Sequence, residues 1–199
     1  MYKIGVTGGI GSGKSTVCQL LKQWGAAVYD SDLKAKELMA SDSELKASII
    51  EAFGAESYDD EGLNRAYLAK QVFGDEAKLQ LLNSIVHPAV KADFQRWAEL
   101  QRAPYVIFES AILFEAGFEA EVDTTLAVMA PLEERIRRAM ERDGASREAI
   151  LSRISHQMCD DELHARAQKT IVNLRLEYLE SDLEQLHKIF AYEASRHNL

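Results

Sequence analysis

Short apolar runs of strand length recur along the chain, with helical patterns between them. The runs cover Ile4–Thr7, Ala26–Tyr29, Tyr105–Phe108, Thr125–Met129 and, more weakly, Thr170–Val172. Strands that alternate with helices are typical of a parallel sheet, because each parallel connection needs a crossover. The pattern therefore predicts an α/β fold built on a five-stranded parallel sheet.

The second and third runs lie about 75 residues apart, far more than one crossover helix needs. Three helical patterns fill this gap. The first follows a capping box at Ser41–Glu44 and ends at Gly54, and the third is expected to break at His87 and Pro88. We therefore predict a mainly helical insertion over 33–102, a candidate binding domain for an acceptor substrate.

Arginines gather after the fourth run. Pro131 can open a helix, and Ser146 can begin a second one. The first of these helices carries Arg135, Arg137, Arg138 and Arg142. Two short arginine-rich helices between strands suggest a lid, predicted here over 132–167. A long amphipathic helix is predicted in the last part of the chain. With the insertion and the lid assigned, the core domain is predicted to consist of residues 1–32, 103–131 and 168–199.

A glycine-rich loop follows the first predicted strand. Residues Gly8–Thr16 fit the Walker A spacing G-x-x-x-x-G-K-[ST]. Glycines let backbone N–H groups approach a phosphate chain, and the helix behind the loop adds its N-terminal dipole. The residues expected to hold a nucleoside triphosphate are Gly11, Ser12, Gly13, Lys14, Ser15 and Thr16. Lys14 would reach the β- and γ-phosphates and Ser15 would ligate Mg²⁺. The loop alone leaves open a phosphoryl donor, an energy source or a switch.

Acidic residues stand where two of the predicted strands end. Asp30 and Asp32 follow the second strand, and Glu109 follows the third. Ligands of parallel sheets lie beyond the carboxyl ends of the strands, so we assign Asp32 to the acceptor hydroxyl and Glu109 to Mg²⁺. A helix cap remains an equal alternative for Asp32. Glu109 could hold the ion directly or through water. The alternative, an ordinary acid at a strand end, is disfavoured by the phosphate loop beside it.

The lid arginines and one histidine complete the candidate site. Arg138 and Arg142 are one helical turn apart, and a closing lid could bring them to the phosphates. Because Glu133, Glu134 and Glu141 lie among the arginines, a solvated, ion-paired face is the alternative. We expect a binding or structural role for His87, since phosphoryl transfer has little need of a strong base.

Composition narrows the possible partners. A net charge of −9 argues against a general nucleic-acid binder, whose surface would be basic. No segment reaches the roughly 18 apolar residues of a membrane span, so a cytoplasmic protein without a membrane partner is expected. Cys18 and Cys159 have no metal-type spacing and are expected to be packed free thiols. The sequence gives no indication of the oligomeric state.

A switch GTPase is the main rival from another functional class. Asp59–Gly62 matches D-x-x-G, but it follows a polar stretch, and a guanine-reading N-K-x-D is absent. A kinase of a different nucleoside or nucleotide is the rival within the same class. The loop does not separate these kinases.

The ordered motifs resemble the dephospho-coenzyme A kinase family almost end to end. Besides the phosphate loop, the matching motifs are Val28–Asp32, Phe53-Gly54, Val72-Phe73, His87-Pro88, Ile112–Glu115, Arg138 with Arg142-Asp143, and Arg153-Ile154 with Gln157. The resemblance implies a P-loop core, a helical domain for the coenzyme A precursor, and a lid. It also implies transfer of the ATP γ-phosphoryl group to the ribose 3′-hydroxyl of dephospho-coenzyme A. By this similarity Asp32 engages the acceptor, Gly11–Thr16 hold ATP, and the lid arginines reach the phosphates.

Three positions depart from the family pattern. The third strand ends in Glu109 where Asp is usual, which leaves direct or water-mediated contact with Mg²⁺ open. Gln168 stands in place of an Asp near the end of the lid. Asn173 is kept, but the glycine usual shortly after it is absent from Leu174–Leu176.

Overall fold

The computed structural model describes residues 1–197 of the chain. Its backbone forms two compact units, Met1–Asp30 with Trp97–Leu199, and Ser31–Arg96. The first unit carries the phosphate loop and the predicted lid. The second carries most of the predicted helical insertion.

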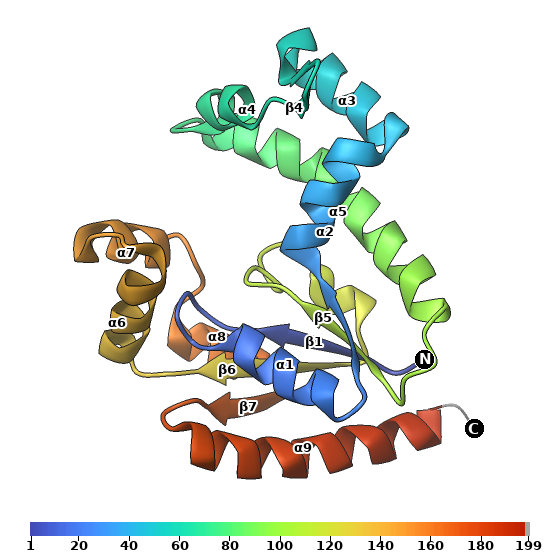
Figure 1. The fold of residues 1–199 in the computed structure, drawn as a ribbon, viewed down its shortest axis with the longest axis vertical. Coiled ribbons are helices and arrows are strands. Elements are labelled where there is room, and N and C mark those ends of the chain that lie inside the picture. Colours follow the sequence, from blue (N-terminus) through green and yellow to red (C-terminus); the bar gives the residue numbers. More distant parts are fainter. Residues whose placement is uncertain (198–199) are drawn as a thin grey trace. The chain divides into compact units, whose positions relative to one another are not determined.

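The first unit is built on a five-stranded parallel sheet in the order β2-β5-β1-β6-β7 (Figure 1). Its strands are β1 (Lys3–Thr7), β2 (Ala27–Asp30), β5 (Val106–Glu109), β6 (Thr124–Met129) and β7 (Lys169–Val172). The predicted strands and their parallel arrangement are confirmed, with every end within one residue of its expected position. In the pairing register, Glu109 lies opposite both Val6 and Asp30. The carboxyl ends of β1, β2 and β5 therefore meet at one edge of the sheet.

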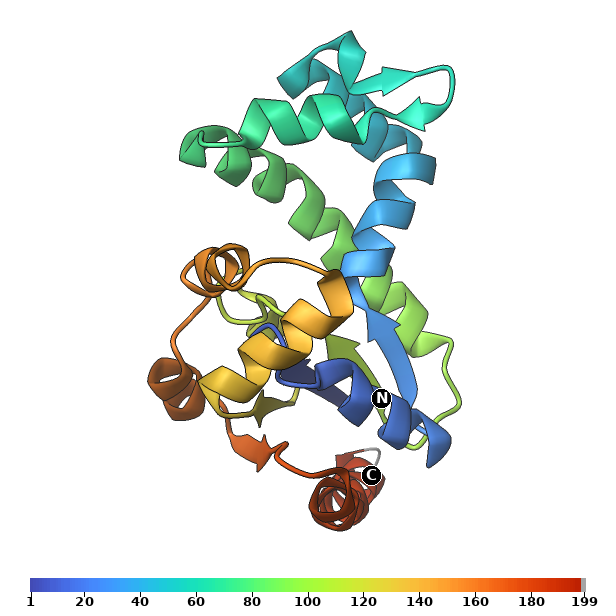
Figure 2. The same cartoon turned by 60° about the vertical axis from the view of Figure 1, so that its left-hand side comes forward.

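Helices α1 (Lys14–Gln23) and α9 (Leu176–His197) pack against one face of the sheet and against each other. Figure 2 looks nearly along α9. Alternate strand residues such as Ile4, Val6 and Val128 join Leu21 and Leu183 in this core, because successive strand side chains point to opposite faces. Burial of such side chains contributes about 1.5–3 kcal/mol each to folding. The long amphipathic helix predicted at the end of the chain is thus confirmed as a core helix.

The opposite face of the sheet is closed by the segment after β5. The Phe108 ring lies 4.8 Å from the ring of Phe118 in η2 (Phe118–Glu121), measured between centroids. A Cβ on Gly5 would come within 2.8 Å of Leu113 Cδ2, so the glycine lets this segment approach the central strand. The approach fixes β1, and with it the start of the phosphate loop.

The segment predicted as a lid contains a third helix that the sequence did not reveal. It consists of α6 (Leu132–Asp143), α7 (Arg147–Ile154) and α8 (Asp160–Arg166). Ser146 caps α7 as expected, but Pro131 precedes α6 as its cap rather than forming its first residue. With seven residues, α8 is too short to show a helical hydrophobic period. Ile136, Ala139 and Ile150 form a small apolar cluster between α6 and α7.

The second unit is mainly helical. Its elements are α2 (Ser31–Ser41), α3 (Ser43–Phe53), η1 (Ala55–Ser57), β3 (Tyr58–Asp59), β4 (Gly62–Leu63), α4 (Arg65–Val72) and all but the last three residues of α5 (Glu76–Glu99). The expected capping box at Ser41 is wrong, because the carboxylate of Asp42 accepts the N–H groups of Glu44 and Leu45. Asp is a strong N-cap residue, and here it moves the helix start by one residue.

The break expected at His87 and Pro88 is also wrong. Helix α5 continues through Pro88, although proline removes one backbone hydrogen bond and costs about 3 kcal/mol inside a helix. Val86, Val90 and Phe94 are buried on the same helix, two of them beyond the proline. Their burial offsets the local cost, so packing overrides the proline.

The D-x-x-G motif of the rival GTPase interpretation lies in a hairpin. Asp59 and Gly62 pair between β3 and β4, and Asp59 accepts a hydrogen bond from the N–H of Glu61. Gly62 has a φ of 114°, which favours glycine. The motif is accounted for by the turn, and it belongs to the unit that does not contain the phosphate loop.

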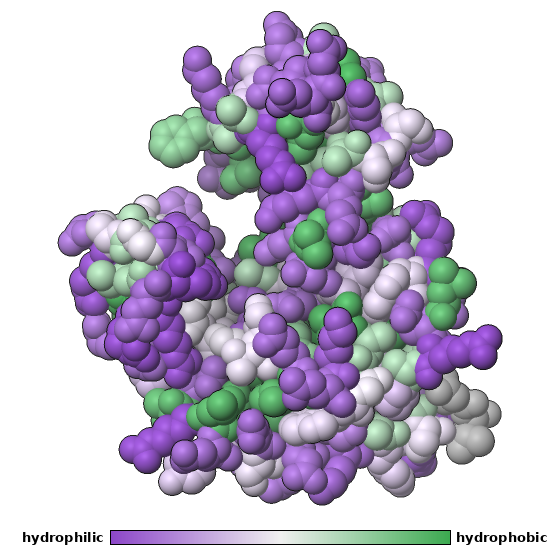
Figure 3. Space-filling view, viewed as in Figure 1, coloured by the Kyte–Doolittle hydropathy of each residue, from purple (hydrophilic) through white to green (hydrophobic). Residues whose placement is uncertain are grey.

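The surface distribution of side chains is uneven (Figure 3). Hydrophilic residues dominate over α6, whereas apolar residues reach the surface over β7 and the start of α9. Val172, Leu174 and Leu176 are exposed there. Within residues 1–197, no helix combines the length and the apolar character that a membrane span requires.

The two cysteines differ in accessibility, so the expectation that both are packed is wrong for Cys159, which is exposed. Cys18 is buried in α1, and burial raises the pKa of its thiol, with the Glu109 carboxylate adding to the shift. We predict that a thiol reagent titrates one cysteine per native chain and the second only after unfolding. Two rapidly reacting thiols in the native protein would contradict this assignment.

Candidate active site

The phosphate loop runs directly from β1 into α1 and needs glycine at specific positions. Gly11 and Gly13 have φ values of 77° and 94°, in the left-handed region. A Cβ on Gly11 would overlap the backbone carbonyl of Arg135, and one on Gly13 would overlap the side-chain amide of Asn173. The glycines thus allow both an unusual backbone and a close approach to the surrounding elements.

Hydrogen bonds within the loop hold it closed on itself. The N–H of Ser12 donates to the Gly9 carbonyl at 3.0 Å, and Val17 continues the helix by donating to Gly13 at 3.1 Å. The ammonium of Lys14 donates to the Gly8 carbonyl at 2.7 Å, across the loop. Its positive charge is thereby held over the segment that would receive phosphates.

The predicted magnesium ligands are brought together. Ser15, in the first turn of α1, donates through Oγ to Glu109 Oε1 at 3.0 Å. Mg²⁺ in phosphoryl-transfer sites commonly takes one or two protein oxygens and fills its octahedron with water and substrate phosphates. The hydroxyl of Ser15 and the carboxylate of Glu109 fit this sparse mode.

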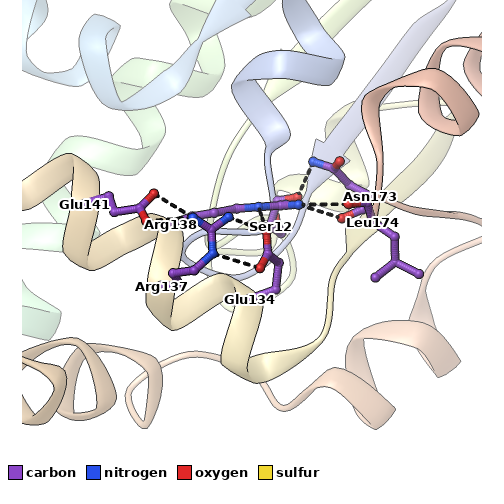
Figure 4. A network of polar contacts seen from close by, with 7 residues as sticks. All are labelled: Ser12, Glu134, Arg137, Arg138, Glu141, Asn173 and Leu174. Carbon is purple, nitrogen blue, oxygen red and sulfur yellow. Dashed lines mark hydrogen bonds and ion pairs between the residues drawn. The ribbon is translucent and has the colours of Figure 1, made fainter.

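Arg138 connects the lid to the turn that follows β7 (Figure 4). Its Nε donates to Glu134 at 2.9 Å, and Nη2 donates to the carbonyls of Asn173 and Leu174 at 3.2 and 3.4 Å. Hydrogen bonds from Arg137 and then from Arg138 lower the pKa of Glu134 to about 2. The carboxylate therefore stays charged at neutral pH and holds both guanidinium groups.

Two buried polar atoms beside the loop lack a protein partner. Within the described chain, Ser12 Oγ and Arg138 Nη1 are both inaccessible to water and form no hydrogen bond. Leaving a buried donor unpaired costs about 1–3 kcal/mol, which an anionic ligand at the loop would recover. Together with the glycine contacts, this arrangement fits a phosphate chain.

Arg142, unlike Arg138, forms its hydrogen bonds within its own helix rather than with the turn after β7. Its guanidinium donates to the neighbouring Asp143, at 2.7 Å from Nε and 3.1 Å from Nη2. Asp143 also accepts from Arg153 at 2.6 Å. Hydrogen bonds from Arg142 and then Arg153 hold the pKa of the Asp143 carboxyl well below its usual range. Both arginines are thus ion-paired, Arg138 with Glu134 and Arg142 with Asp143, but the side chain of Arg142 is 62% exposed and that of Arg138 only 24%.

Sequence reasoning gave no role to Arg135, which is the most deeply placed arginine of the lid. Its side chain is 3% exposed, donates from Nε to the Ile10 carbonyl at 3.0 Å, and forms an ion pair with Asp160. Gln157 accepts the N–H of Ile10 at 2.8 Å. Arg135 precedes Ile136 in the apolar pattern of α6, but the sequence does not separate it from its exposed neighbour Arg137.

The unusual residues after the lid have structural partners. The Gln168 side-chain oxygen accepts both the N–H and the hydroxyl of Thr125 at 2.6 Å, which ties β7 to β6. Asn173 is buried and donates from Nδ2 to the Ser12 carbonyl at 2.9 Å. The turn after β7, which lacks the glycine usual in the family, provides the Asn173 and Leu174 carbonyls that accept from Arg138.

Asp32 and His87 belong to the second unit. Asp32 lies in the first turn of α2, where a carboxylate also suits the helix dipole. Burial lowers the pKa of His87, and the charge of Lys91 acts in the same direction. The imidazole is therefore neutral at pH 7.

Phosphoryl transfer relies on positioning and charge stabilisation. A Walker A loop, an acid beside it and an adjoining arginine-bearing segment are suited to both tasks. On a parallel sheet of this order, they define a P-loop kinase. The family model described as dephospho-CoA kinase (CoaE) matches residues 2–177, and the chain belongs to that family.

Individual relatives agree with this assignment. A Salinibacter ruber dephospho-CoA kinase is 45% identical over 177 residues, which cover 87% of this chain and 89% of the relative. The crystal structure of TT1252 from Thermus thermophilus superposes with a TM-score of 0.82 at 40% identity, covering 96% of this chain and 97% of that one. A Bacteroides thetaiotaomicron shikimate kinase shares the fold, with a TM-score of 0.51 at 14% identity over 94% and 97% of the two chains.

Family membership confirms the predicted fold class and the predicted kinase activity. The chain is an ATP-dependent dephospho-CoA kinase and catalyses the last step of coenzyme A biosynthesis. The rival interpretations as a GTPase switch or as a kinase of another nucleoside are thereby set aside.

Proposed function

We propose that the chain transfers the γ-phosphoryl group of ATP to the ribose 3′-hydroxyl of dephospho-coenzyme A, giving coenzyme A and ADP. The ATP site in this proposal is supported by the closely packed glycines of the phosphate loop and by two buried atoms without a hydrogen-bond partner in the described chain, Ser12 Oγ and Arg138 Nη1. Because the donor is ATP and the acceptor a free small molecule, we also propose a cytoplasmic location.

The first unit supplies the donor site. Backbone N–H groups of Gly11–Thr16 hold the β- and γ-phosphates, and the dipole of α1 adds to their effect. Lys14 exchanges its bond with the Gly8 carbonyl for the phosphate oxygens. Arg138 stabilises the charge that spreads over the transferred group, and Arg142 contributes from the lid surface.

Ser15 and Glu109 would hold Mg²⁺ through their side-chain oxygens. The ion would supply charge neutralisation on the phosphates and bring no acid–base chemistry of its own. The hydrogen bond between the two side chains brings a hydroxyl and a carboxylate together, as such a site needs. Glu109 could bind the ion directly or through a water molecule.

The acceptor half is assigned to the helical insertion over 33–102. Asp32 accepts the proton of the 3′-hydroxyl as the new bond to phosphorus forms, and the bond to the ADP oxygen breaks. A neutral His87 would bind the acceptor through hydrogen bonding rather than through charge. The lid over 132–167 and the core over 1–32, 103–131 and 168–199 complete the proposed division of the chain.

Two acceptor analogues test the position of transfer. We expect purified protein with Mg-ATP to phosphorylate dephospho-coenzyme A and its 2′-deoxy analogue, and to leave the 3′-deoxy analogue unchanged. Phosphorus NMR of the product identifies the esterified oxygen. Turnover of the 3′-deoxy analogue would contradict the proposed acceptor atom while leaving the kinase family intact.

A further inference from the structure

The tip of the phosphate loop is held by the lid through three separate contacts. The N–H of Ile10 donates to Gln157 Oε1 at 2.8 Å, and its carbonyl accepts from Arg135 Nε at 3.0 Å. The Ile10 side chain packs against the apolar cluster between α6 and α7. Both backbone polar groups and the side chain of one loop residue are therefore bound by lid elements.

Arg135 is itself fixed on several sides. Its guanidinium forms an ion pair with Asp160 at the start of α8, and its side chain is buried. A Cβ on Gly9 would overlap the guanidinium, and a Cβ on Gly11 would overlap the Arg135 carbonyl. The loop segment from Gly9 to Gly11 thus lies directly against Arg135.

We propose that Gln157 and Arg135 are positioning residues for phosphoryl transfer, which hold Ile10 so that the loop is shaped for the donor phosphates before ATP arrives. Both side chains bind Ile10, which precedes the amides of Gly11–Thr16, so their action on the nucleotide is indirect. This inference rests on the proposed role of Gly11–Thr16 as the ATP site.

The physical basis is the entropy of the loop. Three of the residues from Gly8 to Gly11 are glycines, and glycine loses more conformational freedom on ordering than any other residue. When the folded protein already fixes this segment, the ordering cost does not reduce the affinity for ATP. Without the contacts from Gln157 and Arg135, the cost falls on nucleotide binding and weakens it.

The expected kinetic signature is a change in KM for ATP with kcat preserved. Once the nucleotide is bound, the loop is ordered in the wild type and in the variants alike. The bound ground state and the transition state therefore lose the same amount of binding free energy. Removal of one hydrogen bond to Ile10 should raise the Kd for a non-hydrolysable ATP analogue about fivefold, which corresponds to one net hydrogen bond. The KM for dephospho-coenzyme A should stay unchanged.

The test compares Gln157→Met, which keeps the length but removes the acceptor, with Gln157→Glu, which keeps an acceptor. Because the added charge repels phosphates, the Kd for the ATP analogue is compared at high salt. There the Kd of the Glu variant should approach that of the wild type, while the Kd of the Met variant should not. Arg147→Met is the control, because it removes a lid ion pair with Glu133 that does not touch the loop. It should leave the Kd unchanged.

Two further measurements separate positioning from general destabilisation. Hydrogen exchange at residues 9–11 should be faster in the nucleotide-free Gln157→Met variant and return to wild-type rates with the ATP analogue bound. Arg135→Met should weaken binding at least as much, and the double variant little more than Arg135→Met, because both residues act on Ile10. If Arg135→Met does not fold, the Gln157 series decides alone.

A wild-type Kd and wild-type exchange in Gln157→Met would overturn the inference. An equal loss of affinity in the Arg147→Met control would also overturn it. So would a loss of affinity that is proportional, across the variants, to the drop in melting temperature of the nucleotide-free protein. Failure of the wild type to bind the ATP analogue would instead refute the proposed donor site.

Discussion

Replacing Asp32 with asparagine is expected to lower kcat by about 10²- to 10⁴-fold, the range that general base catalysis contributes. Asparagine keeps the size and the hydrogen-bonding oxygen of the side chain but cannot take up the proton of the acceptor hydroxyl. The Kd for ATP should not change, because the residues proposed to bind ATP are in the phosphate loop and the lid. Steady-state kinetics and calorimetric titration with an ATP analogue measure the two effects separately.

The same unit offers a matched control for this substitution. Asp42→Asn changes another acidic residue at a helix start, where the side chain caps α3 through Glu44 and Leu45. Asparagine is an equally good cap, so stability and turnover should both be preserved. Undiminished turnover in the Asp32→Asn variant would remove Asp32 from the mechanism. Because Asp32 lies within α2 rather than at its cap position, the role left to it would be interaction with the helix dipole.

Alanine at Gly11 is expected to weaken nucleotide binding and to lower turnover by about 10²-fold or more, because small displacements of positioning groups change reaction rates by that amount. The new Cβ would overlap the backbone carbonyl of Arg135, which cannot swing aside as a side chain could. The φ of 77° adds the strain of a left-handed conformation, about 1–2 kcal/mol for a non-glycine residue.

Gly25→Ala separates strain from collision. Gly25 has a φ of 101°, and among residues 1–197 no atom beyond its chain neighbours lies within 4 Å of the position that a Cβ would take. This variant should therefore lose stability without losing ATP affinity. Chemical denaturation and nucleotide titration of both variants distinguish the outcomes. Equal effects on affinity would show that the close approach between Gly11 and Arg135 is unimportant for binding.

The core of the fold was predictable because local sequence and global packing agree there. Ile4 and Val6 are apolar, lie in a short run and precede a glycine-rich loop, so strand and loop are visible together. Alternation of such runs with helices then determined the parallel sheet. The proximity of Ser15 and Glu109 was predictable as well, Ser15 from the Walker A spacing and Glu109 from the convergence of strand ends in a parallel sheet.

The errors have physical causes that a single sequence hides. Pro88 is a helix breaker by local propensity, yet the buried Val90 and Phe94 carry α5 past it. Ser41 and Asp42 are both good caps, and their local chemistry does not decide between them. In each case a long-range or competing interaction determines the outcome.

The limits were similar at the candidate site. Arg135 and Arg137 are both arginines on α6, yet one is buried against the loop and the other pairs with Glu134 and Glu141 at the surface. Their difference arises from where α6 docks, which is a tertiary property. Gln157 belonged to a recognisable motif, but its bond to Ile10 depends on the path of the chain between α7 and α8.

The exposed thiol of Cys159 has a practical consequence. It stands between Gln157 and Asp160 along the chain, while the second cysteine of the protein, Cys18, is buried. A fluorophore attached in the native state would therefore report from the stretch between Gln157, which binds Ile10, and Asp160, which pairs with Arg135, without prior mutagenesis. The emission during rapid mixing with ATP would show whether nucleotide binding changes the surroundings of this segment, and at what rate.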